Sequence, residues 1–160
     1  MKKITSLVLG GSFLLCGLVL LSGCSYLPKD VMTDASMEPT LMNNTEVIIA
    51  KGDSVINNLE RGDIILFKYP SDSESTLIRR VITLPGETIE IKDGEVYIND
   101  TLLSEPYVDS QIATLTFMGQ LKNVMGDNEF FVMGDNRSDS ADSRTWGSIS
   151  EDTIIGKVVI

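Results

Sequence analysis

The chain has 160 residues, of which 42% are hydrophobic, so it is long enough for one domain with a core and too apolar to be disordered. Its 13 basic and 23 acidic residues give a formal net charge of −10, which argues against nucleic-acid binding because that needs a basic patch. The chain contains no histidine, which excludes a Ser-His-Asp triad and a histidine-ligated zinc site.

The N-terminal segment has the pattern of a targeting signal. Two lysines precede an uncharged stretch of apolar and small residues at 4–21, and Leu-Ser-Gly-Cys follows at 21–24. This tetrapeptide resembles the lipobox of bacterial lipoproteins, which implies removal of residues 1–23 and acylation of Cys24. A retained membrane-spanning helix is the alternative, since about 18 apolar residues suffice to span a bilayer. Both interpretations place the remaining chain at the outer face of the bacterial cytoplasmic membrane, because the lysines stay inside.

Residues 24–33 predict a short membrane tether, for which a loose loop is the simplest interpretation. The chain after it is typical of short antiparallel strands, because its apolar runs alternate or are rich in β-branched residues. These runs lie at 46–51, 63–68, 77–84, 129–133 and 155–160. No long amphipathic helix is predicted after residue 24, so we expect an all-β fold.

A hairpin over residues 88–99 is the clearest local prediction. Ile89 and Ile91 alternate with polar residues, Asp-Gly at 93–94 is a favoured two-residue turn, and a second alternating run follows. Residues 104–128 carry the weakest pattern, with no clear strand or helix periodicity.

Three motifs follow one another in the chain. They are Ser-Met-Glu-Pro-Thr-Leu at 36–41, Arg-Gly-Asp-Ile-Ile-Leu-Phe-Lys-Tyr-Pro at 61–70 and Gly-Asp-Asn-Arg-Ser-Asp-Ser-Ala-Asp-Ser-Arg at 134–144. In this order they resemble the sequence boxes of type I signal peptidases, the serine proteases that cut export signals from secreted proteins. The resemblance implies a signal-peptidase-type antiparallel β-sheet core over 34–160, with a small inserted β cap at about 92–128.

The resemblance also implies roles for the residues of the first motif and of the strand at 77–84. Ser36 would be the nucleophile, and its backbone N–H would form part of the oxyanion hole. Met37, Leu41 and Ile78 would bind substrate in shallow apolar pockets. Pro39 would fix the backbone just after the serine.

Arg79 and Arg80 form the main departure from the family pattern. By position, Arg79 stands where the family has its lysine base, and Arg80 matches a structural arginine. The two side chains should point to opposite faces of their strand. Arginine stays protonated in proteins, so Arg79 could donate to the nucleophile but could not take its proton. A buried guanidinium needs a carboxylate partner, and we expect Asp34 or Asp142 to pair with Arg79 and thereby block the serine.

Two further positions depart from the resemblance. Asp34 replaces a serine or glycine two residues before the nucleophile, and a carboxylate there would disfavour a developing oxyanion. Thr83 replaces a usual glycine. Lys51 or Lys68 could supply the missing base only in a rearranged site.

The third motif is the most specific part of the resemblance. It implies that Ser140 orients the base and that Asp142 and Arg144 form a supporting ion pair. Asp135 and Arg137 would cross-link loops through charge-assisted hydrogen bonds. A calcium loop is the alternative for this oxygen-rich segment, but it lacks the EF-hand order, so we expect neither a metal nor a cofactor.

The predicted function is a membrane-anchored serine endopeptidase that cleaves signal peptides from exported precursors after small residues. The alternative is a catalytically silent binding or assembly factor that holds an extended peptide segment, for example for surface pili. Retention of Ser36 and of the third motif favours the enzyme, whereas Arg79 and Asp34 favour the binding factor. A self-cleaving repressor of related fold is a third possibility, against which the export signal argues.

Overall fold

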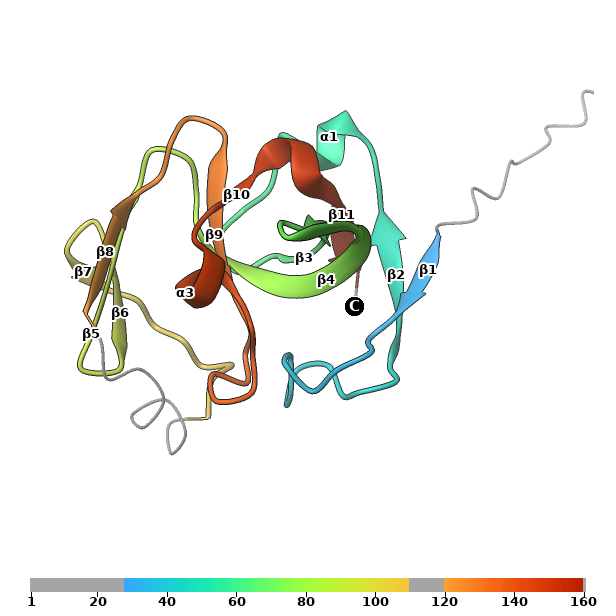
Figure 1. Ribbon diagram of the computed structural model, residues 1–160, viewed down its shortest axis with the longest axis horizontal. Coiled ribbons are helices and arrows are strands. Elements are labelled where there is room, and N and C mark those ends of the chain that lie inside the picture. Colours follow the sequence, from blue (N-terminus) through green and yellow to red (C-terminus); the bar gives the residue numbers. More distant parts are fainter. Residues whose placement is uncertain (1–27, 110–119, 160) are drawn as a thin grey trace, which may run out of the picture.

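Strands make up most of the regular structure in the computed structural model, which describes residues 28–109 and 120–159. They form two antiparallel sheets that lie next to each other (Figure 1). Helical structure in these residues is limited to three short pieces, α1 (Asp53–Ile56), α3 (Ser143–Trp146) and the 3-10 turn η1 (Glu151–Thr153). The predicted all-β class is therefore confirmed.

The larger sheet has seven strands and carries the candidate site. Its order is β1 (Lys29–Val31), β2 (Glu46–Ala50), β11 (Ile154–Val159), β3 (Ile64–Tyr69), β4 (Asp72–Thr83), β9 (Glu129–Met133) and β10 (Ile149–Ser150). Neighbouring strands in this order are antiparallel. The C-terminal half of β4 is buried from residue 78 to residue 83, because the sheet is covered on both faces there. Three of these six buried residues, Arg79, Arg80 and Thr83, are polar or charged.

The smaller sheet has four strands, in the order β7 (Thr101–Leu102), β6 (Glu95–Ile98), β5 (Thr88–Lys92) and β8 (Leu121–Val124). The predicted hairpin at 88–99 is β5 and β6, in which Ile89 lies opposite Ile98. Asp93 and Gly94 have φ values of 52° and 80°, which is the left-handed backbone that a two-residue turn of this kind requires. Alternation along β5 and β6 therefore points one face of this sheet into the core.

Three clusters of buried apolar side chains hold the sheets together. β4 contributes to all of them, with Ile78 in the first, Val81 in the second and Ile82 in the third. The third cluster joins the sheets, because Ile82 packs in it with Ile89 of the smaller sheet. The strand that bears the two arginines is thus fixed from several sides.

Most predicted strands are present with small shifts in their ends, but two segments differ from expectation. The loose loop expected within 24–33 is wrong at 29–31, where β1 pairs with β2. The Met32 side chain after it is only 2% exposed. β1 was missed because its residues are mostly polar and its order comes from backbone pairing. β4 begins at Asp72, before the predicted start at 77, because the exposed polar residues at 72–76 carry no apolar period.

The expected insert at 92–128 overlaps the smaller sheet, whose strands lie within residues 88–124. The expected signal peptide at 1–23 and the expected lipidation of Cys24 fall outside the described residues. Among the helices of residues 28–109 and 120–159, none is both long enough and apolar enough to cross a membrane.

Candidate active site

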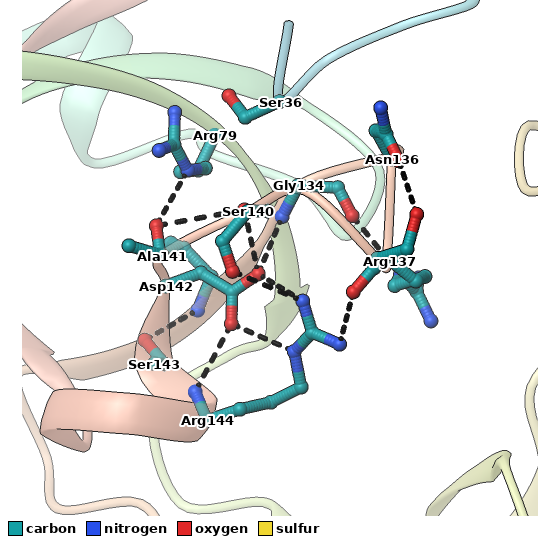
Figure 2. A network of polar contacts seen from close by, with 12 residues as sticks. Ser36, Arg79, Gly134, Asn136, Arg137, Ser140, Ala141, Asp142, Ser143 and Arg144 are labelled. Atoms are coloured by element: carbon teal, nitrogen blue, oxygen red, sulfur yellow. Dashed lines mark hydrogen bonds and ion pairs between the residues drawn. The ribbon is translucent and has the colours of Figure 1, made fainter. Parts of the chain in front are cut away.

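The first and third motifs meet at Ser36, which lies in a turn after β1 and is 1% exposed. Arg79 comes from β4, and the loop that follows β9 passes on the other side of the serine (Figure 2). The Asn136 N–H donates to the Ser36 carbonyl at 2.9 Å, and the Asn136 amide donates to the Ala35 carbonyl at 3.2 Å. These bonds hold the third motif against the first.

Gly134 is required for this close approach of the two loops. A β-carbon at this position would come within 2.5 Å of the Ser36 carbonyl oxygen and of the Ser140 β-carbon. Since the first of these atoms belongs to the backbone, it could not move aside without displacing the serine. The glycine therefore sets the distance between the third motif and Ser36.

Asp34 receives both hydrogen-bond donors of Ser36. The Ser36 hydroxyl donates to Asp34 Oδ1 at 2.5 Å, and the Ser36 backbone N–H donates to the same oxygen at 3.0 Å. Sequence reasoning placed Asp34 near the oxyanion region but missed its direct bond to the hydroxyl. A spacing of two residues within a turn was the signal that could have revealed it, because short polar side chains often bond to nearby backbone in turns.

Arg79 is buried, with a side chain that is 2% exposed, and its hydrogen bonds go to residues other than Ser36. Its Nε donates to the Ala141 carbonyl at 3.0 Å (Figure 2), and its Nη1 donates to the Ile78 carbonyl at 2.6 Å. Its Nη2 donates to Asp34 Oδ2 at 3.4 Å. The predicted carboxylate partner of Arg79 is therefore present, and it is Asp34.

Opposing effects set the pKa values of this ion pair. Burial raises the pKa of Asp34, but the hydrogen bonds from Ser36 and the charge of Arg79 outweigh burial and leave the pKa below its ordinary value. Burial lowers the pKa of Arg79, which the negative charges of Asp34 and Asp142 oppose. At neutral pH the pair is a carboxylate and a guanidinium.

Asp142 is the centre of the supporting network in Figure 2 and has a fully buried side chain. Its Oδ2 accepts from Arg144 Nη2 at 2.7 Å, from the Ser140 hydroxyl at 2.8 Å and from the Gly134 N–H at 3.0 Å. Its Oδ1 accepts from the side chain of Arg144 at 2.8 Å and from the Arg144 backbone N–H at 3.1 Å. The predicted Asp142–Arg144 pair is present, and Asp142 also caps α3.

These bonds also affect the acidity of Asp142. Burial by itself raises its pKa, but the hydrogen bonds and charge of Arg144 and the Gly134 N–H hold the pKa below its ordinary value. Ser140 joins this network by donating to Asp142. It was expected to orient the base, but the hydrogen bonds of Arg79 go to Ala141, Ile78 and Asp34 and not to Ser140.

Arg80 points to the face opposite Arg79, as expected, and pairs with Asp135. Its Nε and Nη2 donate to the two carboxylate oxygens of Asp135 at 2.8 Å and 2.5 Å, and its Nη1 donates to the Gly62 carbonyl at 2.6 Å. The Thr40 hydroxyl donates to Asp135 as well. This bidentate pair joins β4, the first motif and the third motif.

Arg137 joins the third motif to the segment that follows β7. Its two terminal nitrogens donate to the two carboxylate oxygens of Glu105 at 3.0 Å and 2.5 Å, and its Nε donates to the Gly134 carbonyl at 3.0 Å. In the same segment the Tyr107 ring lies 4.1 Å from the Arg80 guanidinium carbon. Asp135 and Arg137 thus cross-link loops as expected, whereas Glu105 and Tyr107 come from the stretch that sequence periodicity could not interpret.

Residues 6–160 match the family described as signal peptidase, peptidase S26. The chain belongs to this signal peptidase family. It is 31% identical over 161 residues to signal peptidase I U of Bacillus subtilis (strain 168), covering 97% of this chain and 86% of that protein. It is 38% identical over 133 residues to signal peptidase I V of the same organism, covering 77% of this chain and 78% of that protein.

A solved structure agrees with this assignment. The crystal structure of a signal peptidase I from Enterococcus faecalis V583 is similar with a TM-score of 0.57 and 30% sequence identity. The match covers 64% of this chain and 97% of that one.

The side chains expected to bind substrate in this signal peptidase family member are largely buried. Met37, Leu41 and Ile78 have exposed fractions of 0%, 4% and 4%, and all lie in the first core cluster. Ile78 lines a cavity of about 50 Å³ that also borders Asp34 and the strand β1. Met37 is fully buried, so it offers no exposed surface to a substrate in this conformation.

A larger cavity lies on the Arg79 side of the site, with a volume of about 350 Å³. Its lining includes Asp34, Arg79, Asp139, Tyr69 and Trp146. Tyr69 and Trp146 make an edge-to-face contact with ring centroids 5.1 Å apart, which gives the cavity an aromatic wall.

Residues 28–109 and 120–159 place no other amine of the sequence-predicted set at Ser36. Lys51 and Lys68 are exposed, whereas Ser36 is buried. In the same part of the chain, no three acidic or cysteine side chains come together as a metal site would require. Pro39 follows a cis peptide bond within the turn that holds Ser36.

Proposed function

We propose that this chain is a serine endopeptidase of the signal peptidase I type that cleaves exported precursors after small residues. The observation that carries the proposal is the meeting of the first and third motifs at buried Ser36, whose hydroxyl already donates to an acceptor at 2.5 Å. A serine is a useful nucleophile only with an acceptor for its proton, and this geometry provides one.

The proposed reaction begins with attack of the Ser36 hydroxyl oxygen on the carbonyl carbon of the scissile peptide. The backbone N–H of Ser36 faces the same side as its hydroxyl, since both donate to one oxygen, and it is the natural donor to the oxyanion. Asp142 and Arg144 keep the third motif in place behind the serine through Gly134. The larger cavity, which borders Asp34 and Ala35 next to the serine, gives a peptide more room to approach than the cavity beside Ile78.

We further propose that the enzyme acts at the outer face of the cytoplasmic membrane. The leader at 1–23 would be removed and Cys24 acylated, with residues 25–28 linking the lipid to β1. A retained N-terminal helix is the alternative anchor. Labelling of growing cells with an alkyne fatty acid should tag the wild-type chain and leave Cys24→Ser untagged. Equal labelling of both chains would contradict lipidation of Cys24.

A second candidate function is supported by the ion pair between Arg79 and Asp34. Because Asp34 holds both donors of Ser36 and Arg79 cannot take a proton, the same geometry suits a silent factor that binds an extended peptide without cutting it. Such a factor could serve a surface-assembly machinery such as a pilus system.

The two candidates are separated by assaying the full-length chain in detergent with a precursor peptide whose signal ends in Ala-x-Ala. The variants are Ser36→Ala, Arg79→Lys and, as a matched control, Ser54→Ala at an exposed position in α1. Cleavage by the wild type and by Ser54→Ala, but not by Ser36→Ala, supports the endopeptidase. An inactive wild type together with an active Arg79→Lys supports the binding factor.

A further inference from the structure

We propose that Asp34 is the general base of this site, that it takes the Ser36 proton directly, and that Arg79 positions it. The proposal rests on the endopeptidase function above and assigns the proton acceptor that this function requires. Its first support is direct contact, because Asp34 Oδ1 accepts a hydrogen bond from the Ser36 hydroxyl with an oxygen–oxygen distance of 2.5 Å. A candidate base must lie within hydrogen-bond reach of the proton that it abstracts, and Asp34 meets this condition.

The two oxygens of Asp34 are divided between the nucleophile and a positioning group. Oδ1 faces Ser36, and Oδ2 accepts from Arg79 Nη2 at 3.4 Å. Arg79 is itself held by the carbonyls of Ala141 and Ile78. A nucleophile, a base in contact with it and a third group that orients the base are the parts of a hydrolytic triad. Here the order is Ser36, Asp34 and Arg79.

Asp34 can also reach the leaving group. Its side chain is 42% exposed, whereas those of Ser36 and Arg79 are buried. It borders both the cavity beside Ile78 and the larger cavity with the aromatic wall. A proton accepted from Ser36 can therefore pass to a leaving amine or be exchanged with water in either space.

The proposed step balances as follows. The Ser36 proton moves to Asp34 Oδ1 while the serine oxygen bonds to the carbonyl carbon and the carbonyl π electrons move to oxygen. Neutral Asp34 then gives this proton to the peptide nitrogen as the carbon–nitrogen bond breaks, which leaves an acyl-serine. A water molecule then attacks the ester carbon while Asp34 takes one of its protons. Asp34 returns this proton to the Ser36 oxygen as the ester carbon–oxygen bond breaks, which releases the acid and restores both Ser36 and the Asp34 carboxylate.

Transfer of the proton to Asp34 removes the repulsion expected between the Asp34 carboxylate and a developing oxyanion. As the proton moves to Asp34, the negative charge leaves the carboxylate and appears on the substrate oxygen. The Ser36 N–H, which donates to Asp34 at rest, is then free to turn to the new anion. Of Asp34 and the substrate oxygen, only one therefore carries a negative charge at each stage, and the two never face each other as anions.

The proposal predicts an unusual pH profile. The charged and titratable groups around Asp34 are Asp30 and Tyr69 on the cavity walls, Asp139 across the larger cavity and the Arg79 guanidinium. Arg79 and the Ser36 donors keep the pKa of Asp34 below its ordinary value, so the carboxylate remains available at neutral and mildly acidic pH. We expect kcat/KM to be flat above about pH 5 and to fall only below about pH 4. A lysine base would instead give a rise on the alkaline side of neutrality.

The test uses the full-length chain in detergent and the precursor peptide, comparing the wild type with Asp34→Asn. Asparagine keeps an oxygen that can accept from Ser36 but removes the basicity. We expect kcat to fall by at least about a hundredfold, since a general base contributes about 10² to 10⁴ in rate. Asp152→Asn makes the same chemical change at an exposed position in η1 and should retain full activity.

Arg79→Gln tests the positioning role of Arg79 through the pH profile of cleavage, which a purely structural role would leave unchanged. Removal of the positive charge should raise the pKa of Asp34 and shift the acid limb of the pH profile to higher pH. Equal or greater activity in Asp34→Asn would overturn the proposal and make Asp34 an inhibitory contact, while the endopeptidase function would stand. A wild type without Ser36-dependent cleavage at any pH would overturn both proposals.

Discussion

Asp142→Asn is the substitution that tests the supporting network most directly. Asp142 is fully buried and accepts from Arg144, Ser140 and Gly134, so the variant removes a buried negative charge and leaves Arg144 as an uncompensated guanidinium. Breaking a buried ion pair from one side costs about 3–5 kcal/mol. Asparagine caps a helix as well as aspartate does, so loss of the α3 cap adds little and we expect about 3 kcal/mol.

The assay is urea unfolding at pH 7 followed by circular dichroism, with the wild type as reference. Glu46→Gln is the matched control, because the Lys29–Glu46 pair has side chains that are 66% and 67% exposed and such pairs contribute little. The midpoint of Asp142→Asn should fall clearly, whereas that of Glu46→Gln should stay close to the wild-type value. A loss below about 1 kcal/mol for Asp142→Asn would refute the assignment of Asp142 as the centre of the network.

The destabilisation caused by Asp142→Asn should depend on pH, because the pKa of Asp142 is lowered in the folded protein. A carboxyl whose pKa is lower in the folded state stabilises the fold above its unfolded pKa of about 3.9, and this stability is lost as the pH falls through the folded value. The difference in free energy of unfolding between the wild type and Asp142→Asn should therefore be fully present at pH 7 and should become smaller below about pH 4.

Three further substitutions test other parts of the site. Gly134→Ala should destabilise the fold by about 1–3 kcal/mol and reduce Ser36-dependent cleavage, because the added β-carbon would clash with the Ser36 carbonyl. Gly126→Ala is the control and should change unfolding and cleavage little, because its β-carbon would meet only the Glu129 side chain at 3.3 Å. Arg80→Lys should cost about 2 kcal/mol in urea unfolding, because lysine cannot reproduce the bidentate bond to Asp135, and an unchanged midpoint would argue against that bond. Glu105→Gln should cost about 3 kcal/mol and speed hydrogen exchange in residues 103–109, because Arg137 loses its charged partner; unchanged exchange would contradict the role of this pair in holding the segment.

Sequence patterns predicted those parts of the fold whose order comes from local chemistry. The hairpin at 88–99 was readable because its alternation and its Asp-Gly turn agree with each other. β9 was found at its observed bounds as a compact apolar run. β1 and the first half of β4 were missed, because polar residues there are held by backbone pairing, which side-chain hydropathy does not reveal.

The same division applies to the site. Period two correctly separated Arg79 from Arg80, and the cost of burying a guanidinium correctly required a carboxylate beside Arg79. Hydropathy and spacing could not decide between Asp34 and Asp142, because that choice depends on how two distant loops pack. The partner of Arg137 was out of reach for the same reason, since Glu105 is 32 residues away in a segment without periodicity.

The position of β11 has a consequence for how this protein is made. This strand lies between β2 and β3, so the two halves of the larger sheet cannot join until residues 154–159 have left the ribosome. A nascent chain that already carries Ser36 and every residue of the network around it therefore remains an unclosed sheet. Closure of the larger sheet around the network should therefore follow, in biogenesis, the synthesis of every residue that the network contains.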